Sequence, residues 1–417
     1  MFPLCVRLVR PLGLLVALLV CVSAASAQTK KDKAKGGQAV GPADYRSEHF
    51  LVHSDLSAEE AKDLLDRLET MLSLISQYWA RPCAGIIECY VVNDLSNWPD
   101  GQIPPEGLGS VQAGAGVTVT STLSGGVGFL ARSVVYAKAD HGTPQHEAVH
   151  AYCGQTFGTT GPTWYSEGMA EMGQYWRKDD KSVRVHDVVI DYLRSSPPKS
   201  LNEIVNGEEF TGDSWQNYAW RWALCHLLAN NTNYSAKFRP LGLALLKKEP
   251  TSFEAVYGDM AEEIVFEYRF FLEHLEQGFR ADLCSWEWKR KSRLPKGSAV
   301  VTAKIKADHG WQHSGAMVTS GTSYDCSAPG TWQTSKEGPA VSADGAEQNG
   351  AGRLLGIIMS ERDGKDFKLG EPFELGSKGR FTATTDGKLY LRCQDSWGEL
   401  ADNKGTLTVK IKAGKPD

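Results

Sequence analysis

The sequence predicts an α+β fold in which a small sheet and a set of helices precede an all-β sandwich. Between residues 57 and 275, apolar side chains recur mostly at helical spacing, with a few short apolar strands among them. From residue 297 onward, short alternating segments separated by Gly, Asp and Asn replace that pattern. The chain has 417 residues, which is enough for two or more domains.

The first 27 residues have the composition of a secretory signal peptide. Arg7 and Arg10 precede an apolar stretch at residues 12–22, and residues 25–27 form an A-x-A cleavage signature. The stretch is too short to cross a bilayer, and no later segment reaches that length. We therefore expect a secreted or periplasmic protein without an integral membrane segment after cleavage. Residues 28–43, rich in Lys, Gly and Ala, predict a flexible leader.

The folded part is expected to begin with a strand and a long helix. The strand covers residues 50–53, and the helix begins with a capping box that joins Ser57 to Glu60. Apolar residues at helical spacing then predict a core-facing stripe, formed by Leu64, Leu65, Leu68, Leu72 and Ile75.

Two further strands are predicted, at residues 86–92 and 133–137. The Gly-rich stretch 107–128 lies between them and has no phosphate-loop signature. It predicts either a mobile flap or a hairpin.

A histidine pair on a predicted helix forms the first candidate site. In the segment Gln145-His-Glu-Ala-Val-His150, the two histidines are four residues apart, so both imidazoles can bind one metal ion. Glu147 is rotated by about 100° from His146 and can face a metal-bound water. Thr143 is a suitable N-cap, and Pro144 suits the first helical position. This pattern predicts catalytic zinc, which needs three protein ligands and one open position.

Glu167 is the best candidate for the third ligand. It lies seventeen residues after His150, beyond a Gly/Thr/Pro loop at residues 158–162 that lets a second helix return beside the first. Glu171 follows one helical turn later, where its carboxylate can accept the free ring N–H of a ligand histidine.

The two segments His146-Glu-Ala-Val-His150 and Ser166-Glu-Gly-Met-Ala-Glu171 resemble those of the gluzincins, the metallopeptidases that include thermolysin and the aminopeptidase N family. The chain is also similar to secreted bacterial proteins of the peptidase MA-like group. The resemblance covers residues 45–291 and implies a zincin-like catalytic domain. It implies zinc ligands at His146, His150 and Glu167, a general base at Glu147, and a supporting carboxylate at Glu171.

The resemblance also implies a hydrogen-bond donor for the oxyanion, taken from the helical half that follows. Tyr218 and His226 lie in such a helical run, and we take Tyr218 as the catalytic candidate. Both have a structural alternative, Tyr218 as a packed ring and His226 as a core residue. Cys153 follows His146 by seven residues on the same face, where a small buried thiol is the alternative to a metal contact.

After Trp176 the chain is predicted to be helical up to a domain boundary. Pro295 and Gly297 follow a cluster of Lys and Arg, and this change of composition separates a catalytic domain at residues 44–294 from a second domain at 297–417. Helices are expected at residues 200–204, 218–228, 238–246 and 261–275.

The second domain is predicted to be a β-sandwich with a calcium loop. Its strands are expected at residues 300–305, 352–358, 380–384, 389–392 and 406–411. The loop at residues 394–403 carries hard oxygen side chains, which suit Ca²⁺, at Asp395, Asp402 and Asn403. An ordinary surface turn is the alternative.

This domain resembles the calcium-dependent galactose-binding bacterial lectins of the LecA (PA-IL) type. The resemblance spans most of residues 299–412 and implies Asp395, Asp402 and Asn403 as side-chain ligands, with Glu399 giving its backbone oxygen. The chain has Asp402 where those lectins have asparagine, and their sugar-binding segment is not recognisable here. The domain would direct the protein to glycans.

The number of cysteines limits the disulfides that can form. Nine cysteines become seven once Cys5 and Cys21 leave with the signal peptide, so at least one thiol is free, and we choose Cys153. Cys83 with Cys89, and Cys326 with Cys393, are the candidate bridges.

The net charge is −5 and there is no basic patch with interleaved aromatics, so nucleic acid is not an expected partner.

The sequence thus predicts an exported zinc metallopeptidase that acts on a peptide or protein substrate and carries a lectin-like domain. The rival prediction is a catalytically inert carbohydrate-binding or surface-adhesion protein.

Overall fold

The computed structural model describes residues 41–125 and 128–414, and it has the predicted α+β class. It contains two compact units, one that ends at Thr160 and one that begins at Gly161. The predicted signal peptide and almost all of the predicted leader lie outside the described residues. None of the helices in the described part has the length and apolar character needed to cross a membrane.

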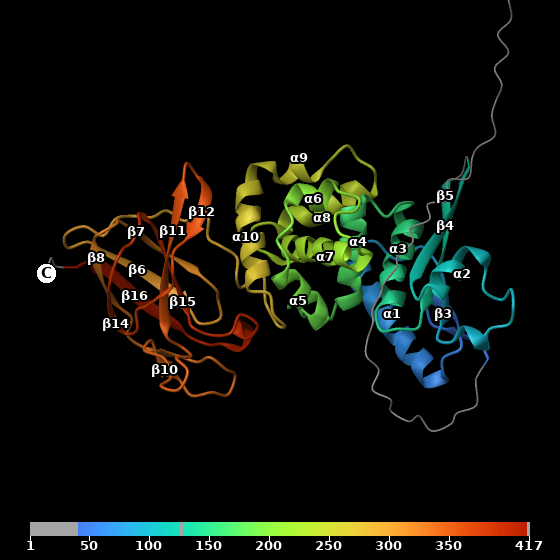
Figure 1. The fold of residues 1–417 in the computed structure, drawn as a ribbon, viewed down its shortest axis with the longest axis horizontal. Coiled ribbons are helices and arrows are strands. Elements are labelled where there is room, and N and C mark those ends of the chain that lie inside the picture. Colours follow the sequence, from blue (N-terminus) through green and yellow to red (C-terminus); the bar gives the residue numbers. More distant parts are fainter. Residues whose placement is uncertain (1–40, 126–127, 415–417) are drawn as a thin grey trace, which may run out of the picture. The chain divides into compact units, whose positions relative to one another are not determined.

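The first unit is built on a five-stranded sheet with the order β1-β2-β3-β5-β4. Figure 1 labels three of its strands, β3, β4 and β5. The three inner strands are parallel, and β1 and β4 pair antiparallel at the two edges. The three strands predicted in this part are confirmed, and so is the hairpin alternative for the Gly-rich stretch. The strands are β1 (Ala43–Arg46), β2 (Phe50–Ser54), β3 (Ile87–Val92), β4 (Gly116–Gly125) and β5 (Gly128–Lys138).

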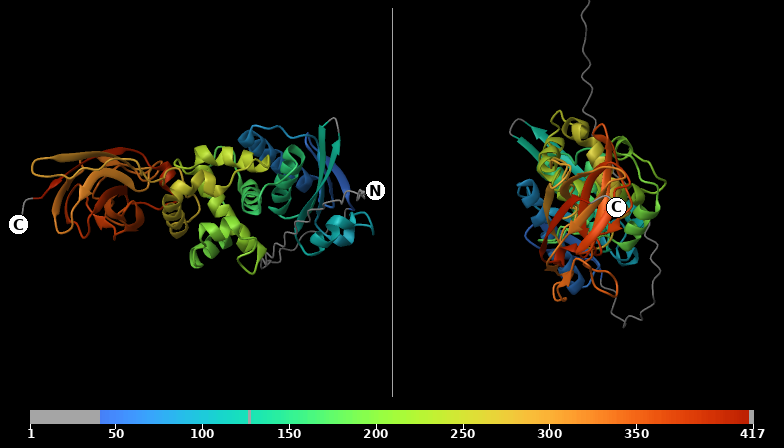
Figure 2. Two further views of the ribbon diagram at one scale, coloured as in Figure 1. Left: turned by 90° about the horizontal axis from the view of Figure 1, so that it is seen from above. Right: turned by 90° about the vertical axis from the view of Figure 1, so that its left-hand side faces the viewer.

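Helices cover both faces of this sheet, because the strands alternate their side chains. Along β5, the face with Ser133 meets α3 (Thr143–Phe157), and the face with Tyr136 meets α2 (Pro105–Gln112). α1 (Ala58–Trp79) packs against α3 and begins with the predicted capping box. Figure 2, in its left view, shows α1 and α3 on one side of the strands and α2 on the other. The predicted stripe of α1 is buried.

The helical part of the second unit surrounds one buried helix, α7 (Ser214–Asn230). Every residue from 217 to 228 of α7 is buried, as expected for a helix that is packed on all sides. The predicted helices are confirmed, and the helices at Asp187–Ser195 and Phe253–Tyr257 were not predicted. The neighbours of α7 are α4 (Thr163–Tyr175), α5 (Asp187–Ser195), α6 (Leu201–Asn206), α8 (Ser235–Leu246) and α10 (Ala261–Glu273), while α9 (Phe253–Tyr257) packs on α8.

Residues from 300 onward form the predicted sandwich of two antiparallel sheets. One sheet has the order β12-β11-β15-β7 with β13 also on β11, the other has the order β14-β8-β16-β6, and β9 pairs with β10. The strands are β6 (Val300–Lys306), β7 (Gln312–Val318), β8 (Ser323–Ser327), β9 (Thr331–Trp332), β10 (Val341–Ser342), β11 (Leu354–Arg362), β12 (Lys365–Leu369), β13 (Phe373–Glu374), β14 (Lys378–Thr382), β15 (Gly387–Cys393) and β16 (Thr406–Ala413).

Strand β11 is covered on both faces, which explains its nearly continuous apolar sequence. Leu354 and Ile358 point into the core between the sheets. Ile357 and Met359 point the other way, into a second cluster. This outer cluster joins the sheet to α10 and to the segment that precedes the sandwich, and its buried members are Phe270, Trp286, Trp311, Ile357, Met359 and Tyr390.

A buried carboxylate joins α10 to the segment around Trp286. Glu267 is 2% exposed. Its oxygens accept hydrogen bonds from Asn231, Asn233, Tyr234 and Trp288 side chains and from the Trp286 backbone N–H. Burial raises the pKa of Glu267, and the four side-chain donors act in the opposite direction.

The predicted disulfides are absent from the described structure, so that prediction is wrong. All seven described cysteines are free, and each except Cys83 is buried. Cys326 and Cys393 belong to one core between the two sheets, where each packs as a small apolar side chain. Burial raises the pKa of each of these two thiols to about 12.

Candidate metal centre

The helix that carries the histidine pair begins one residue earlier than predicted. Gly142 is the N-cap, and Thr143 is the first helical residue, so the predicted N-cap is wrong by one position. The cause is Asp140, whose carboxylate accepts hydrogen bonds from the backbone N–H groups of Gly142 and Thr143 and from the Thr143 hydroxyl. A carboxylate at this end of a helix satisfies its free N–H groups.

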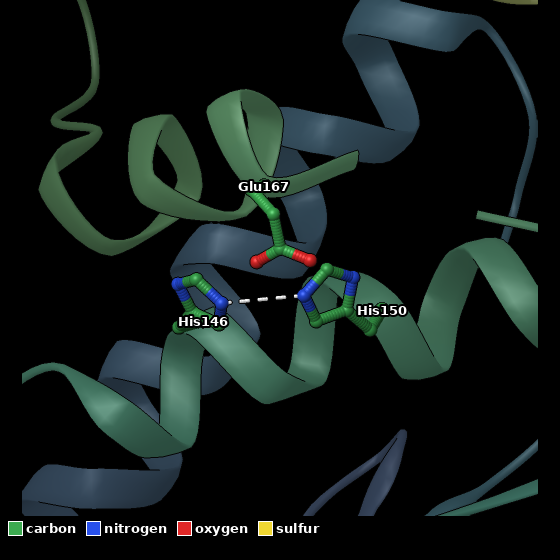
Figure 3. Close-up of side chains that lie close together, drawn as sticks. All are labelled: His146, His150 and Glu167. Atoms are coloured by element: carbon green, nitrogen blue, oxygen red, sulfur yellow. Dashed lines mark hydrogen bonds between the residues drawn. The ribbon is translucent and has the colours of Figure 1, made fainter. Parts of the chain in front are cut away.

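The three predicted zinc ligands come together in the structure. One ligand atom from each of His146, His150 and Glu167 lies within 4.8 Å of the others (Figure 3). His146 and His150 are each 4% exposed, and Glu167 has no exposed surface. Figure 3 shows the Glu167 carboxylate directed toward the two imidazoles.

The spacing of the histidine nitrogens fits a tetrahedral ion. The two Nε2 atoms are 3.2 Å apart. Two Zn–N bonds of about 2.0–2.1 Å at a tetrahedral angle would place them about 3.3 Å apart. Two imidazoles and one buried carboxylate are also a ligand set that catalytic zinc sites use. The residues therefore fit zinc.

Glu147 faces a different neighbour from the histidines, as its position on the helix predicts. It is 1% exposed and lies against β4. The Thr118 hydroxyl is 2.8 Å from Glu147 Oε2 and 2.8 Å from the Glu147 backbone oxygen. Gly116 is the next residue on that face of β4, and a Cβ there would lie only 2.6 Å from Glu147 Cγ.

Gly168 explains how α7 approaches the third ligand. A Cβ at this position would lie 2.4 Å from Cys225 Sγ and 2.8 Å from the backbone oxygen of Arg221. The glycine beside Glu167 therefore allows α4 and α7 to pack with their backbones close together.

Arg221 is a site residue that the sequence did not indicate. It is 2% exposed and donates hydrogen bonds to the backbone oxygens of Gly207 and Glu208. Burial lowers the pKa of its guanidinium, while the charge of Glu167 acts in the opposite direction. A positive charge thus lies near the buried carboxylate. Its sequence signal is that α7 contains no other Lys or Arg and no Asp or Glu.

The remaining residues that the sequence analysis singled out for this site are Tyr218, Glu171, Cys153 and His226. Tyr218 lies on α7 one turn before Arg221 and is 8% exposed. Glu171 is half-buried, one turn after Glu167 on α4, and its role stays a prediction. Cys153 is a buried thiol whose pKa is raised by desolvation. His226 stacks on Phe271 at 5.8 Å, and burial lowers its pKa to about 4, as its structural alternative implies.

The loop at residues 394–403 contains two buried oxygens that suit a cation. Asp395 Oδ2 and Asn403 Oδ1 accept no hydrogen bond from the described residues. Burial raises the pKa of the Asp395 carboxyl. Asp402 is exposed and accepts from the Lys336 backbone N–H at 3.3 Å, and Glu399 is exposed in the same loop. A hard cation would satisfy the two buried oxygens.

Comparisons with known proteins find similar solved structures but no matching family model or curated protein. Among solved structures, the chain is similar to a domain described as "EclA N-terminal domain; PllA-like lectin", with 18% sequence identity and a TM-score of 0.22. The match covers 27% of this chain and 95% of that domain.

Proposed function

We propose that this chain is a zinc-dependent metallopeptidase of the gluzincin type. One observation carries the proposal. Buried ligand atoms of His146, His150 and Glu167 lie within 4.8 Å of one another, and two of these residues flank Glu147 on one helix. Charged and polar groups are rarely buried together unless they are paired or hold a metal ion.

The chemistry follows from the residues around the metal. When bound, zinc lowers the pKa of a water ligand to about 7 and polarises a carbonyl group. Glu147 would accept the proton of the attacking water and pass it to the leaving amine. Tyr218 would donate a hydrogen bond to the oxyanion, and the positive charge of Arg221 would offset the negative charge of Glu167.

The proposed substrate is an extended peptide or protein segment. The edge strand β4 pairs with β5 on one side and with no other described strand. An extended peptide can add to such an edge through main-chain hydrogen bonds, which makes few demands on its sequence. Because Thr118 of β4 contacts Glu147, a peptide on this edge would run past the general base.

Metal analysis with a protease assay tests the proposal. We expect about one zinc per chain and hydrolysis of casein that a chelator removes and added Zn²⁺ restores. Casein turnover that is insensitive to chelators, or a chain that binds no zinc, would show the proposal to be wrong. Glycan binding without any turnover would favour an inert carbohydrate-binding or surface-adhesion protein.

We further propose that the protein is exported, to the periplasm or the medium, and that its sandwich is a lectin-like targeting domain. The domain would hold Ca²⁺ through Asp395, Asp402 and Asn403 and the backbone oxygen of Glu399. The two buried oxygens without a hydrogen-bond partner among the described residues support this.

Calcium titration of the intact protein tests the calcium site. We expect Ca²⁺ to raise the melting temperature, because a ligand that binds the folded state stabilises it. The variant Asp395→Asn should lose most of the increase, whereas Asp363→Asn, at an exposed position of the same domain, should keep it. An equal response of both variants would argue against the site.

A further inference from the structure

We propose that Thr118 is a positioning residue that fixes the orientation of the Glu147 carboxylate. The inference rests on the proposed function, because it concerns the group assigned there as the general base. Its evidence is independent of the zinc ligands. The Thr118 hydroxyl lies 2.8 Å from both Glu147 Oε2 and the Glu147 backbone oxygen, so one β4 side chain contacts the main chain and side chain of the base.

Thr118 and Thr120 lie on the same face of β4, but they have different contacts. Glu147 and Gly154 both face β4, and each meets a different part of the strand. At Gly154, a Cβ would lie 2.5 Å from Thr120 Oγ1, and Thr120 itself is hydrogen-bonded to Ser133 Oγ at 2.8 Å. Thr120 therefore contacts the neighbouring strand, whereas Thr118 contacts the base.

Gly116 provides the space that the Glu147 side chain occupies. Residues 116 and 118 share a face of β4, because side chains of a strand alternate. A Cβ at Gly116 would lie 2.6 Å from Glu147 Cγ and 2.8 Å from Oε1. The glutamate side chain thus passes over the glycine, and the Thr118 hydroxyl contacts its far oxygen. The space for the carboxylate and the donor that orients it come from two residues of one strand.

The expected effect is on turnover and not on substrate binding. A hydrogen bond to a charged carboxylate is short and directional, so it restricts the orientation of that group. Misplacement of a catalytic group by about 1 Å can cost about 10²-fold in rate. Thr118 contacts none of the proposed zinc ligands in the described hydrogen bonds, so zinc content should not change.

The test compares two threonines on the same strand. Thr118→Val removes the hydroxyl at nearly constant volume, Thr118→Ser retains it, and Thr120→Val is the matched control. In the zinc-loaded full chain, we expect Thr118→Val to lower kcat by about 10- to 100-fold with KM and zinc content nearly constant. Thr118→Ser should restore most of kcat, and Thr120→Val should resemble the wild type. Equal losses in both valine variants, or none in Thr118→Val, would overturn the proposal.

Crystal structures of the two valine variants give a readout that does not depend on turnover. The Glu147 carboxylate should rotate in Thr118→Val and stay in place in Thr120→Val. If the wild type binds zinc but hydrolyses no peptide, the proposed function fails, and the carboxylate orientation still decides the role of Thr118. An unchanged carboxylate in Thr118→Val would show that the hydroxyl does not position it.

Discussion

The Glu147→Gln variant is expected to retain zinc and to lose about 10²- to 10⁴-fold in kcat. Glutamine has nearly the same shape, so it can occupy the buried space beside Gly116. Its amide cannot accept a proton from the attacking water. Zinc content measured beside the rate of peptide hydrolysis checks this result, since His146 and His150 are untouched.

A second glutamate provides the control for that substitution. Glu59→Gln makes the same change of charge at an exposed position of α1, and it should leave both zinc content and kcat unchanged. Chelator-sensitive hydrolysis at the wild-type rate in Glu147→Gln would exclude Glu147 as the general base. Loss of zinc in this variant would mean that Glu147 helps to hold the metal.

The Glu267→Gln variant is expected to lower the free energy of unfolding by about 3 kcal/mol. Glu267 accepts hydrogen bonds from five groups, whereas a glutamine has one acceptor oxygen and would turn its NH₂ group toward other donors. Buried donors would therefore lose their acceptor. Trp286 and Trp288 lie at this network, so denaturant unfolding followed by tryptophan fluorescence reports on it.

Glu273→Gln is the matched control, because Glu273 is an exposed residue at the end of the same helix. Its unfolding midpoint should stay within the range of ordinary surface substitutions, about 0.5 kcal/mol. A midpoint for Glu267→Gln that equals that of Glu273→Gln would mean that water or rearranged donors replace the lost acceptor.

Elements with strong local signals were predicted well, and those that depend on distant contacts were not. The capping box and apolar stripe of α1 are local features, and both are confirmed. Helix α2 was not predicted because it contains Gly107 and Gly109. A Cβ at Gly107 would overlap Tyr136, which makes that glycine a packing requirement. Strand β7 was missed because its buried Gln312 and Ser314 are satisfied by partners elsewhere in the chain.

The candidate site likewise contains residues that local sequence signals indicate and residues that only tertiary packing brings to it. Helical spacing was sufficient to place His146 and His150 on one face, and the loop with Gly and Pro suggested the return of Glu167. Thr118 and Arg221 could not be found by spacing, because β4 and α7 reach the motif helices only through tertiary packing. No sequence rule connects a threonine on an edge strand with a glutamate twenty-nine residues later.

The double burial of β11 has a practical consequence for dissecting this chain. A fragment cut at the composition change near residue 297 would keep the sandwich strands and lose Phe270 and Trp286. Ile357, Met359 and Tyr390 would then be exposed to water as one apolar patch. Such patches promote self-association. A recombinant fragment meant for glycan arrays should therefore start upstream of α10, so that the sheet retains its cover.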